Sequence, residues 1–551
     1  MPADTLPLWS RELIELYESG AASQFILHGN IADLLLMPAS KSLGTLDVYL
    51  KDVLLGKFDV VLSYDVGNGV RVEKGGYTFA QWPAFKEKAL PSAPRDAIFA
   101  LTHYLRFAAN LGKIKPDKTI RVAVIVRAAD LIAPPSPGGA NYELSGIAWQ
   151  LREWGSDPNL AGSHCATFLL TENLNDLHPL VSQNGQAAKL AVPLPQAAEL
   201  EPALGVLHAK YPIPLRPFAE KLSEPAAALA GATLNSVETL VQTRQHRRQP
   251  LNANDLVALK KELVEKDAAG LIEFIKPDRT LEDLHGQDAI KKWLRQDITL
   301  WRQGDLAALP MGYLFCGPVG TGKTFMVECL AGEAGVPVVK MKNFRDKWVG
   351  STESNLEKIF RLLSALGRCI VFVDEADQSL GRRTADSGDS GVGGRVYGMM
   401  AEQMSNSRNR GRILWALATS RPDLVEVDLK RPGRVDVKIP IFPTVTADEG
   451  YALIRALSKR RGVVLAEKLA DPLRASIPDL LTPGAAEALS VKIYRAIKTG
   501  AGSPDAALDA ALQDYQPPVP QAVIEAQIAL AIAEATDLSF VPERFRGTGG
   551  Q

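Results

Sequence analysis

Residues 313–331 read YLFCGPVGTGKTFMVECLA, and this stretch decides the fold of the second half of the chain. The apolar run 313–316 predicts a short buried strand, and the residues after 324 continue with helical character. Between them lies the pattern G-x-x-x-x-G-K-T, whose glycines let backbone N–H groups face phosphate. The predicted nucleotide-binding residues are Gly317, Pro318, Val319, Gly320, Thr321, Gly322, Lys323 and Thr324.

Two side chains of this loop have distinct predicted roles. Lys323 can reach the β- and γ-phosphates of ATP, and Thr324 can place its hydroxyl on Mg²⁺. The helix N-terminus adds partial positive charge at the same place. ATP and Mg²⁺ are therefore the predicted ligands. The simpler alternative is a glycine turn before an ordinary helix.

A second strand with two acids at its end follows in 369–377, CIVFVDEAD. Four consecutive apolar residues predict a strand buried on both faces, as in a parallel sheet. Asp374 is predicted to hold Mg²⁺, and Glu375 to orient and deprotonate the attacking water. The alternative is a strand that ends in two solvated acids, and the preceding phosphate loop argues against it.

Three flanking segments extend the pattern, namely 280–287 (TLEDLHGQ), 414–424 (LWALATSRPDL) and 431–436 (RPGRVD). With the two motifs above, they resemble the AAA clade of the AAA+ ATPases. The resemblance implies roles for seven more residues: Asp283 and His285 beside adenine, Ser420 as the polar sensor, Arg431 and Arg434 as arginine fingers for a neighbouring subunit, and Gly484 and Ala485 at the start of a lid helix.

The resemblance also implies a partner and an assembly. Trp348-Val349-Gly350 falls where the clade has a loop that faces the central pore of a hexamer. We therefore expect a homo-hexamer that remodels or threads a protein partner, with Trp348 as an apolar handle. The alternative for an aromatic residue beside glycine is core packing.

Two departures from the clade bear on the rate of ATP hydrolysis and on the coupling between subunits. Serine replaces the usual asparagine at the sensor position, and its hydroxyl has a shorter reach. Residues 405–412, SNSRNRGR, replace the usual intersubunit signal. A second reading of the chain is therefore a nucleotide-dependent scaffold or switch with slow hydrolysis.

The first half resembles a degenerate copy of the second. Residues 121–130, RVAVIVRAAD, match the strand of Asp374 in pattern and place Arg127 over Asp374 and Ala128 over Glu375. Aligning 25–30 with 313–318 places Leu35 over Lys323, and aligning 182–186 with 430–434 places glutamines over both fingers. In the lids, Gly231 is aligned with Gly484. We therefore expect the first module to lack the catalytic groups. The alternative is an unrelated α/β domain.

The predicted fold is two tandem α/β modules, each a parallel sheet with helices on both faces followed by a helical lid. The paired arrangement resembles AAA proteins of unassigned role from bacteria and plastids. The predicted segments are a degenerate AAA-like module over 1–195, its lid and linker over 196–272, an active ATPase domain over 273–443, a second lid over 444–540, and a flexible tail over 541–551.

The composition agrees with this reading. The chain has 551 residues with 62 basic and 63 acidic side chains, so no overall charge favours nucleic acid. No apolar run approaches the ~18 residues that span a bilayer. The four cysteines form no C-x-x-C pair, which favours a reducing compartment. We expect a cytoplasmic protein with no membrane span.

Overall fold

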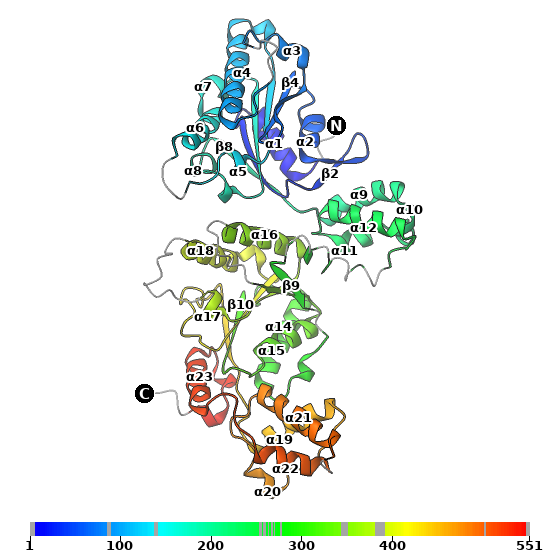
Figure 1. Cartoon of the computed structure of the whole chain (residues 1–551), viewed down its shortest axis with the longest axis vertical. Coiled ribbons are helices and arrows are strands. Elements are labelled where there is room, and N and C mark those ends of the chain that lie inside the picture. The colour runs from blue at the N-terminus through cyan, green and yellow to red at the C-terminus, as the bar shows by residue number, and fades with distance from the viewer. Residues whose placement is uncertain are drawn as a thin grey trace. The chain divides into compact units, whose positions relative to one another are not determined.

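The computed structural model divides the chain into two compact units (Figure 1). The first comprises residues 1–269 and 348–365, and the second comprises residues 270–347 and 366–551. The structure describes residues 6–84, 90–136, 141–252, 256, 261–262, 264–265, 268, 270–275, 278–342, 351–380, 392–500 and 503–546. The predicted pore loop, Trp348-Val349-Gly350, lies outside the described residues, as does the predicted tail beyond residue 546.

The first unit is built on a six-stranded sheet in the order β5-β4-β6-β7-β1-β8. All neighbouring strands are parallel except the edge pair β4/β5. The central strands are mainly apolar and are buried along almost their whole length, as in a sheet covered by helices on both faces. The strands are β1 (Gln24–Gly29), β4 (Val60–Asp65), β5 (Gly69–Lys74), β6 (Val122–Val126), β7 (Cys165–Thr171) and β8 (Ala187–Val192).

Alternate residues of β1 enter two different cores, as the period of a strand requires. Ile26 packs with side chains of α4 and α6, whereas Phe25 and Leu27 pack with those of α1 and α2. The helices of this part are α1 (Leu8–Glu18), α2 (Leu46–Tyr49), α3 (Gly76–Ala80), α4 (Pro94–Ile114), α5 (Ala129–Ile132), α6 (Tyr142–Ser156), α7 (Pro158–Ala161) and α8 (Pro179–Ser182).

A hairpin and a helical lid complete this unit. The hairpin, β2 (Leu34–Met37) and β3 (Ser42–Thr45), stands between β1 and α2. The lid has its own core, which includes Leu204, Leu229 and Val237. Its helices are α9 (Ala197–Lys210), α10 (Pro212–Leu215), α11 (Ser223–Leu229) and α12 (Leu234–His246).

The second unit contains a six-stranded sheet in the order β14-β10-β13-β12-β11-β9. Here too only the edge pair, β11/β9, is antiparallel. The strands are β9 (Ile272–Ile275), β10 (Gly312–Cys316), β11 (Val338–Met341), β12 (Cys369–Val373), β13 (Ile413–Thr419) and β14 (Val437–Pro440). Helix α14 (Asp288–Gln303) covers one face through a stripe of buried residues at helical spacing, Ile290, Leu294, Ile298 and Trp301.

The remaining helices of the second half lie between its strands or after them along the chain. A separate apolar core, which includes Ile454, Leu489 and Leu508, joins helices of the second lid. Helix α23, at the end of the predicted lid 444–540, instead packs beside β14. The helices are α15 (Lys323–Ala334), α16 (Ser351–Leu366), α17 (Ala376–Ser379), α18 (Val392–Ser405), α19 (Ala447–Arg460), α20 (Asp471–Arg474), α21 (Pro483–Lys498), α22 (Pro504–Gln513) and α23 (Gln521–Glu534).

The two sheets share one plan. When the orders are read from β8 and from β14, each strand of one sheet corresponds to a strand of the other, including the antiparallel edge. The residue that follows β6, Arg127, thus corresponds to Asp374, which follows β12, as the sequence predicted. The next residues, Ala128 and Glu375, both have a left-handed backbone, with φ of 46° and 47°. The predicted fold class, two tandem α/β modules with lids, is confirmed.

Two details of the predicted alignment between the modules differ in the structure. Leu35 lies in the hairpin and does not correspond to Lys323. Lys323 is the first residue of α15, and the first residue of the helix that follows β1 is Leu46. In the lids, Thr233 and Thr482 both cap the helix that begins at the next residue, so Gly231 does not correspond to Gly484. The alignment without gaps after β1 selects Leu35 because the hairpin is inserted between β1 and α2.

Candidate active site

The glycine-rich loop after β10 has a backbone that requires glycine. Gly317 has φ of 150°, and a Cβ atom there would lie 2.1 Å from the carbonyl oxygen of Ile441. Gly320 and Gly322 have φ of 82° and 84°, in the left-handed region. Gly322 is also the residue before α15, so the turn delivers the chain directly into the helix. The result is a tight loop at a helix N-terminus, the geometry that binds phosphate.

Lys323 points back into this loop. Its Nζ donates to the carbonyl oxygens of Gly317 and Pro318, at 2.8 and 2.9 Å. Burial lowers the pKa of Lys323 to about 8. The ammonium group is therefore held at the loop by backbone oxygens, at the place where phosphate oxygens would offer stronger, charged acceptors.

Thr324 and Asp374 meet at the carboxyl end of the sheet. Thr324 Oγ1 lies 3.5 Å from Asp374 Oδ2, and Lys340 Nζ lies 2.8 Å from the same oxygen. A hydroxyl and a carboxylate are the oxygen ligands that Mg²⁺ prefers. The donor set therefore fits Mg²⁺, and Thr324 and Asp374 are the residues that would hold it. Lys340, on β11, was not predicted from the sequence.

Glu375 is exposed and stands on a strained backbone. Its left-handed conformation is uncommon for a residue other than glycine and tends to occur at functional sites. The backbone N–H of Glu375 donates to Asp374 Oδ1 at 3.1 Å, which couples the two acids. The turn directs the glutamate away from the strand and into solvent, where an attacking water would be available to it.

The predicted sensor, Ser420, follows β13 directly and is partly buried. Strands β12 and β13 pair in parallel, with Val373 opposite Leu417, so their carboxyl ends lie side by side. The residue before the sensor, Thr419, donates from Oγ1 to Asp377 Oδ1 at 2.6 Å. This bond ties the sensor strand to the helix that follows Glu375. Sequence reasoning missed both of its members.

Arg431 and Arg434 share a carboxylate. Arg431 Nη1 lies 3.0 Å from Asp428 Oδ1, and Arg434 Nη1 pairs with Asp428 Oδ2. Tyr397 Oη donates to the same Oδ2 at 3.1 Å. The Arg431 side chain is 69% exposed, against 22% for Arg434. Asp428 thus holds both arginines in place, and only Arg431 extends fully into solvent.

The second lid meets the glycine-rich loop through the start of α21. The backbone N–H of Gly484 donates to the carbonyl oxygen of Gly320 at 3.0 Å, and Thr482 Oγ1 caps the helix by accepting from Ala485 N–H. The predicted adenine segment lies on the surface. Asp283 Oδ2 accepts from the N–H of Thr280, and His285 is exposed.

Helix α23 touches the loop from the other side. Gln527 is 8% exposed, and its Oε1 accepts the backbone N–H of Val319 at 3.1 Å. Seven residues further along, Glu534 pairs with Lys430 and with Lys438. One helix therefore contacts both the phosphate loop and the segment that carries the arginines. These contacts join residues far apart in sequence, and no local motif announces them.

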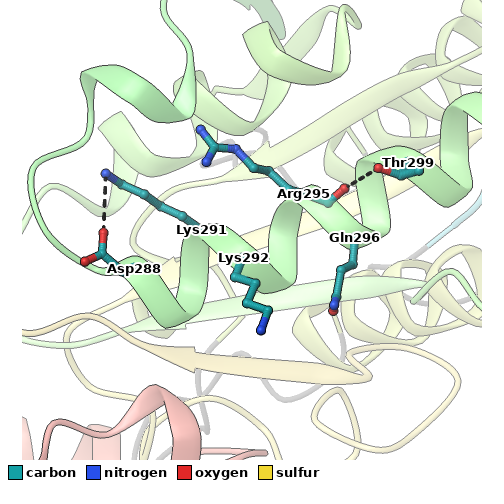
Figure 2. Close-up of a pocket in the computed structure, with 6 residues that line it drawn as sticks. All are labelled: Asp288, Lys291, Lys292, Arg295, Gln296 and Thr299. Carbon is teal, nitrogen blue, oxygen red and sulfur yellow. Dashed lines mark hydrogen bonds and ion pairs between the residues drawn. The ribbon is translucent and has the colours of Figure 1, made fainter.

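A separate hollow of about 380 Å³ lies along one face of α14 (Figure 2). Its lining has three cationic side chains and one acid, and the Lys291 ammonium reaches the Asp288 carboxylate at 4.0 Å. None of its residues belongs to the motifs above. The lining residues are Asp288, Lys291, Lys292, Arg295, Gln296 and Thr299.

Comparison with known protein families assigns both halves. Residues 313–442 match the family described as "ATPase family associated with various cellular activities (AAA)". The second half of the chain therefore contains an AAA ATPase domain. Residues 1–193 match the family "AAA+ chaperone, N-terminal Rossmann-like domain". The predicted family and the predicted enzyme class, an ATP hydrolase, are thereby confirmed for this AAA ATPase.

Curated relatives match about a third of this AAA ATPase. An ATP-dependent zinc metalloprotease FtsH of Lancefieldella parvula is 30% identical over 185 residues, which is 32% of this chain and 29% of the relative. The cell division cycle protein 48 homolog of Archaeoglobus fulgidus is 29% identical over 216 residues, 38% and 28%. The peroxisomal ATPase PEX1 of Dictyostelium discoideum is 33% identical over 164 residues, 28% and 13%. The match thus spans less than a third of each relative.

None of the described helices of the AAA ATPase is both long enough and apolar enough to cross a bilayer. The four cysteines are free and buried. The predicted cytoplasmic location remains a prediction.

Proposed function

We propose that this AAA ATPase assembles into a ring, hydrolyses ATP at Gly317–Thr324 and Asp374–Glu375, and uses the cycle to remodel or thread a protein partner. The observation that carries the proposal is the place of Arg434 on the sheet. The chemistry at the nucleotide, the role of the first module and the partner follow from it in turn.

The backbone of Arg434 lies at the amino end of β10, opposite to the end from which the phosphate loop begins. Its carbonyl oxygen would lie 2.7 Å from a Cβ atom on Gly312, the first residue of β10. The phosphate loop begins after the last residue of the same strand. Five residues of strand span about 16 Å, at ~3.3 Å each. A guanidinium anchored near the amino end of β10 is poorly placed for the nucleotide of its own subunit. A neighbouring subunit's nucleotide is the alternative target.

The residues of the site then divide the chemical work. Lys323 and the loop N–H groups bind the phosphates, and Thr324 with Asp374 holds Mg²⁺, which when bound neutralises phosphate charge. Glu375 orients the attacking water and accepts its proton. Arg431 and Arg434 stabilise the developing charge from the next subunit. Such fingers are typically worth ~10³–10⁵ in rate.

The relatives favour a protein as the partner. The archaeal and peroxisomal relatives are AAA ATPases of the same family, and the match of residues 1–193 is to a family named for AAA+ chaperones. We propose that the first module, which has Arg127 and Ala128 in place of the two acids, serves assembly or substrate recruitment rather than hydrolysis. Trp348 remains the proposed pore residue of a homo-hexamer.

The test is ATP turnover per subunit against protein concentration, with Arg434→Ala beside the wild type. Turnover that rises with concentration and collapses in the variant is expected. Mixing Arg434→Ala with Glu375→Gln adds a sharper measurement, because each inactive subunit supplies what its neighbour lacks. Recovered turnover in the mixture supports fingers that act between subunits. Turnover that ignores both concentration and Arg434 refutes the ring.

A threading assay separates the motor from its rival. Trp348→Ala should keep basal hydrolysis and abolish remodelling of a protein partner. The rival is a nucleotide-dependent scaffold or switch, favoured by the serine at position 420 and by the pairing of Lys340 with Asp374 and of Lys323 with backbone oxygens. It predicts very slow turnover and oligomers that persist with Glu375→Gln.

A further inference from the structure

The first unit holds an ion cluster where the second has its candidate metal site. Arg127, at the position of Asp374, directs Nη2 to the carboxylate of Asp47 and lies 3.7 Å from Glu73 Oε1. Asp47 is the second residue of α2, just as Thr324 is the second residue of α15. The residue after the strand thus differs in sign between the two modules: here Arg127 meets two carboxylates, and there Asp374 meets the Thr324 hydroxyl and the Lys340 ammonium.

The acid that follows β1 makes a second unusual set of contacts. Asp33 is 3% exposed, in the loop that leaves β1 as the phosphate loop leaves β10. Its carboxylate accepts from the backbone N–H of Leu234 and of Asn235, each at 2.9 Å. These are the first two residues of the lid helix α12. Asn30 Nδ2 and the N–H of Leu34 complete the set at 2.9 and 2.8 Å.

The corresponding contact in the second unit is a hydrogen bond between neutral groups, which is weaker than one to a carboxylate. There the lid helix α21 meets the loop through a neutral bond from Gly484 N–H to the Gly320 carbonyl. An ionised carboxylate at a helix N-terminus forms stronger, charge-assisted bonds and is favoured by the helix dipole. Asp33 thus offers α12 the negative charge that a phosphate group would offer a helix N-terminus.

We propose that Asp33 and Arg127 are built-in substitutes for the phosphate charge and the metal cation, and that Asp33 keeps the first lid on its sheet in every nucleotide state. The inference goes beyond the proposed function, because it holds for the first module whatever the second module remodels. A module with its own charges in place needs no ligand to close, so it provides a surface that does not change during the ATP cycle.

The test is hydrogen exchange of the full chain, read at the start of α12. In the wild type, the amides of Leu234 and Asn235 should exchange at the same rate with and without Mg²⁺ and ADP, while amides around Gly484 respond to the nucleotide. Asp33→Ala should speed exchange at Leu234 and Asn235 by about tenfold or more, since two charge-assisted bonds are lost. Bound fluorescent ADP should amount to one per chain.

The matched control is Asp65→Ala. Asp65 also accepts two backbone N–H groups, from Gly67 and Asn68, but in the β4–β5 turn. It should leave exchange at α12 unchanged. If Asp33→Ala disturbs the whole unit, exchange in β6 will also be faster, and Asp33→Asn is then the variant to use. Asparagine keeps one acceptor oxygen, so a smaller acceleration of exchange at α12 is expected.

Three results would overturn the inference. They are nucleotide-dependent exchange at α12 in the wild type, two bound nucleotides per chain, and unchanged exchange at α12 in both Asp33 variants. None of these results bears on whether Arg434 acts between subunits, so failure here and failure of the proposed function remain distinguishable.

Discussion

Lys340 and Asp374 form an ion pair at the candidate metal site, with Nζ and Oδ2 2.8 Å apart. The same carboxylate oxygen is the one that Thr324 approaches. The lysine therefore supplies positive charge at the place where Mg²⁺ is proposed to bind. Lysine and metal compete for one oxygen.

Removing this lysine should strengthen the binding of Mg²⁺. We expect Lys340→Met to lower the Mg²⁺ concentration for half-maximal binding of fluorescent ADP by about three- to tenfold, as loss of one nearby like charge predicts. Lys340→Arg keeps the charge and serves as the control. A higher Mg²⁺ requirement in Lys340→Met would instead mean that the lysine orients Asp374 for the metal.

Asp428 should act on turnover through the two arginines it holds. In Asp428→Asn, Arg431 and Arg434 lose their shared charged acceptor, and we expect kcat to fall about tenfold while KM for ATP stays within a factor of two. Arg434 lies beside the first residue of β10, at the opposite end of that strand from the phosphate loop, so ground-state binding of ATP is spared. Asp423→Asn, which breaks only the Arg421–Asp423 pair, should leave kcat unchanged.

Glu534 should contribute to stability because its partner is buried. The Lys430 side chain is 8% exposed, and Glu534 also pairs with Lys438 at 3.0 Å. Glu534→Gln leaves a buried ammonium without its counter-charge, at a cost of about 2–3 kcal/mol. Thermal unfolding of the full chain should show a lower transition temperature for the second unit. Glu525→Gln, on the same helix and exposed, should not; an equal shift in both variants argues against the pairing.

His28 should make the first unit sensitive to acid. Burial lowers the pKa of His28 to about 4, so the folded protein favours the neutral imidazole. Its unfolded value is about 6.5. The contribution of His28 is therefore fully present above about pH 6.5 and declines as the pH falls toward 4, by up to about 3 kcal/mol.

Hydrogen exchange in β6 and β7 at pH 7 and pH 5 measures this effect. His28→Gln should reduce the extra opening that the wild type shows at pH 5, after correction for intrinsic exchange. His103→Gln, an exposed position, should behave as the wild type does. A wild-type unit with the same opening free energy at both pH values would refute the linkage.

The second module could be read from sequence because its chemistry is local. The glycines of the phosphate loop, Lys323 and Thr324 lie within eight residues, and Asp374 and Glu375 are adjacent. The backbone angles of Gly317, Gly320 and Gly322 explain why these positions carry glycine. The strand that precedes each motif was visible as an apolar run. Fold class and enzyme class followed from these segments.

The parts that were missed depend on long-range contacts or on an insertion. Lys340 reaches Asp374 across neighbouring strands, and Gln527 reaches Val319 from the far end of the chain. Neither lysine on a strand nor glutamine on a helix signals such a contact by itself. In the first module, the hairpin 34–45 displaces the helix that follows β1, so counting residues without gaps selected Leu35 where the structure has Leu46.

The bond between Asp33 and Leu234 also sets an order of events during synthesis. The two residues are 201 positions apart, so the ribosome makes the acid about 10–40 s before the helix that it caps, at ~5–20 residues per second. The second unit repeats the delay, with 208 positions between Val319 and Gln527. Because Leu234 is made before β10 begins, the bond between Asp33 and α12 can form on the ribosome before the phosphate loop exists, whereas residues 348–365 of the first unit are made only after that loop.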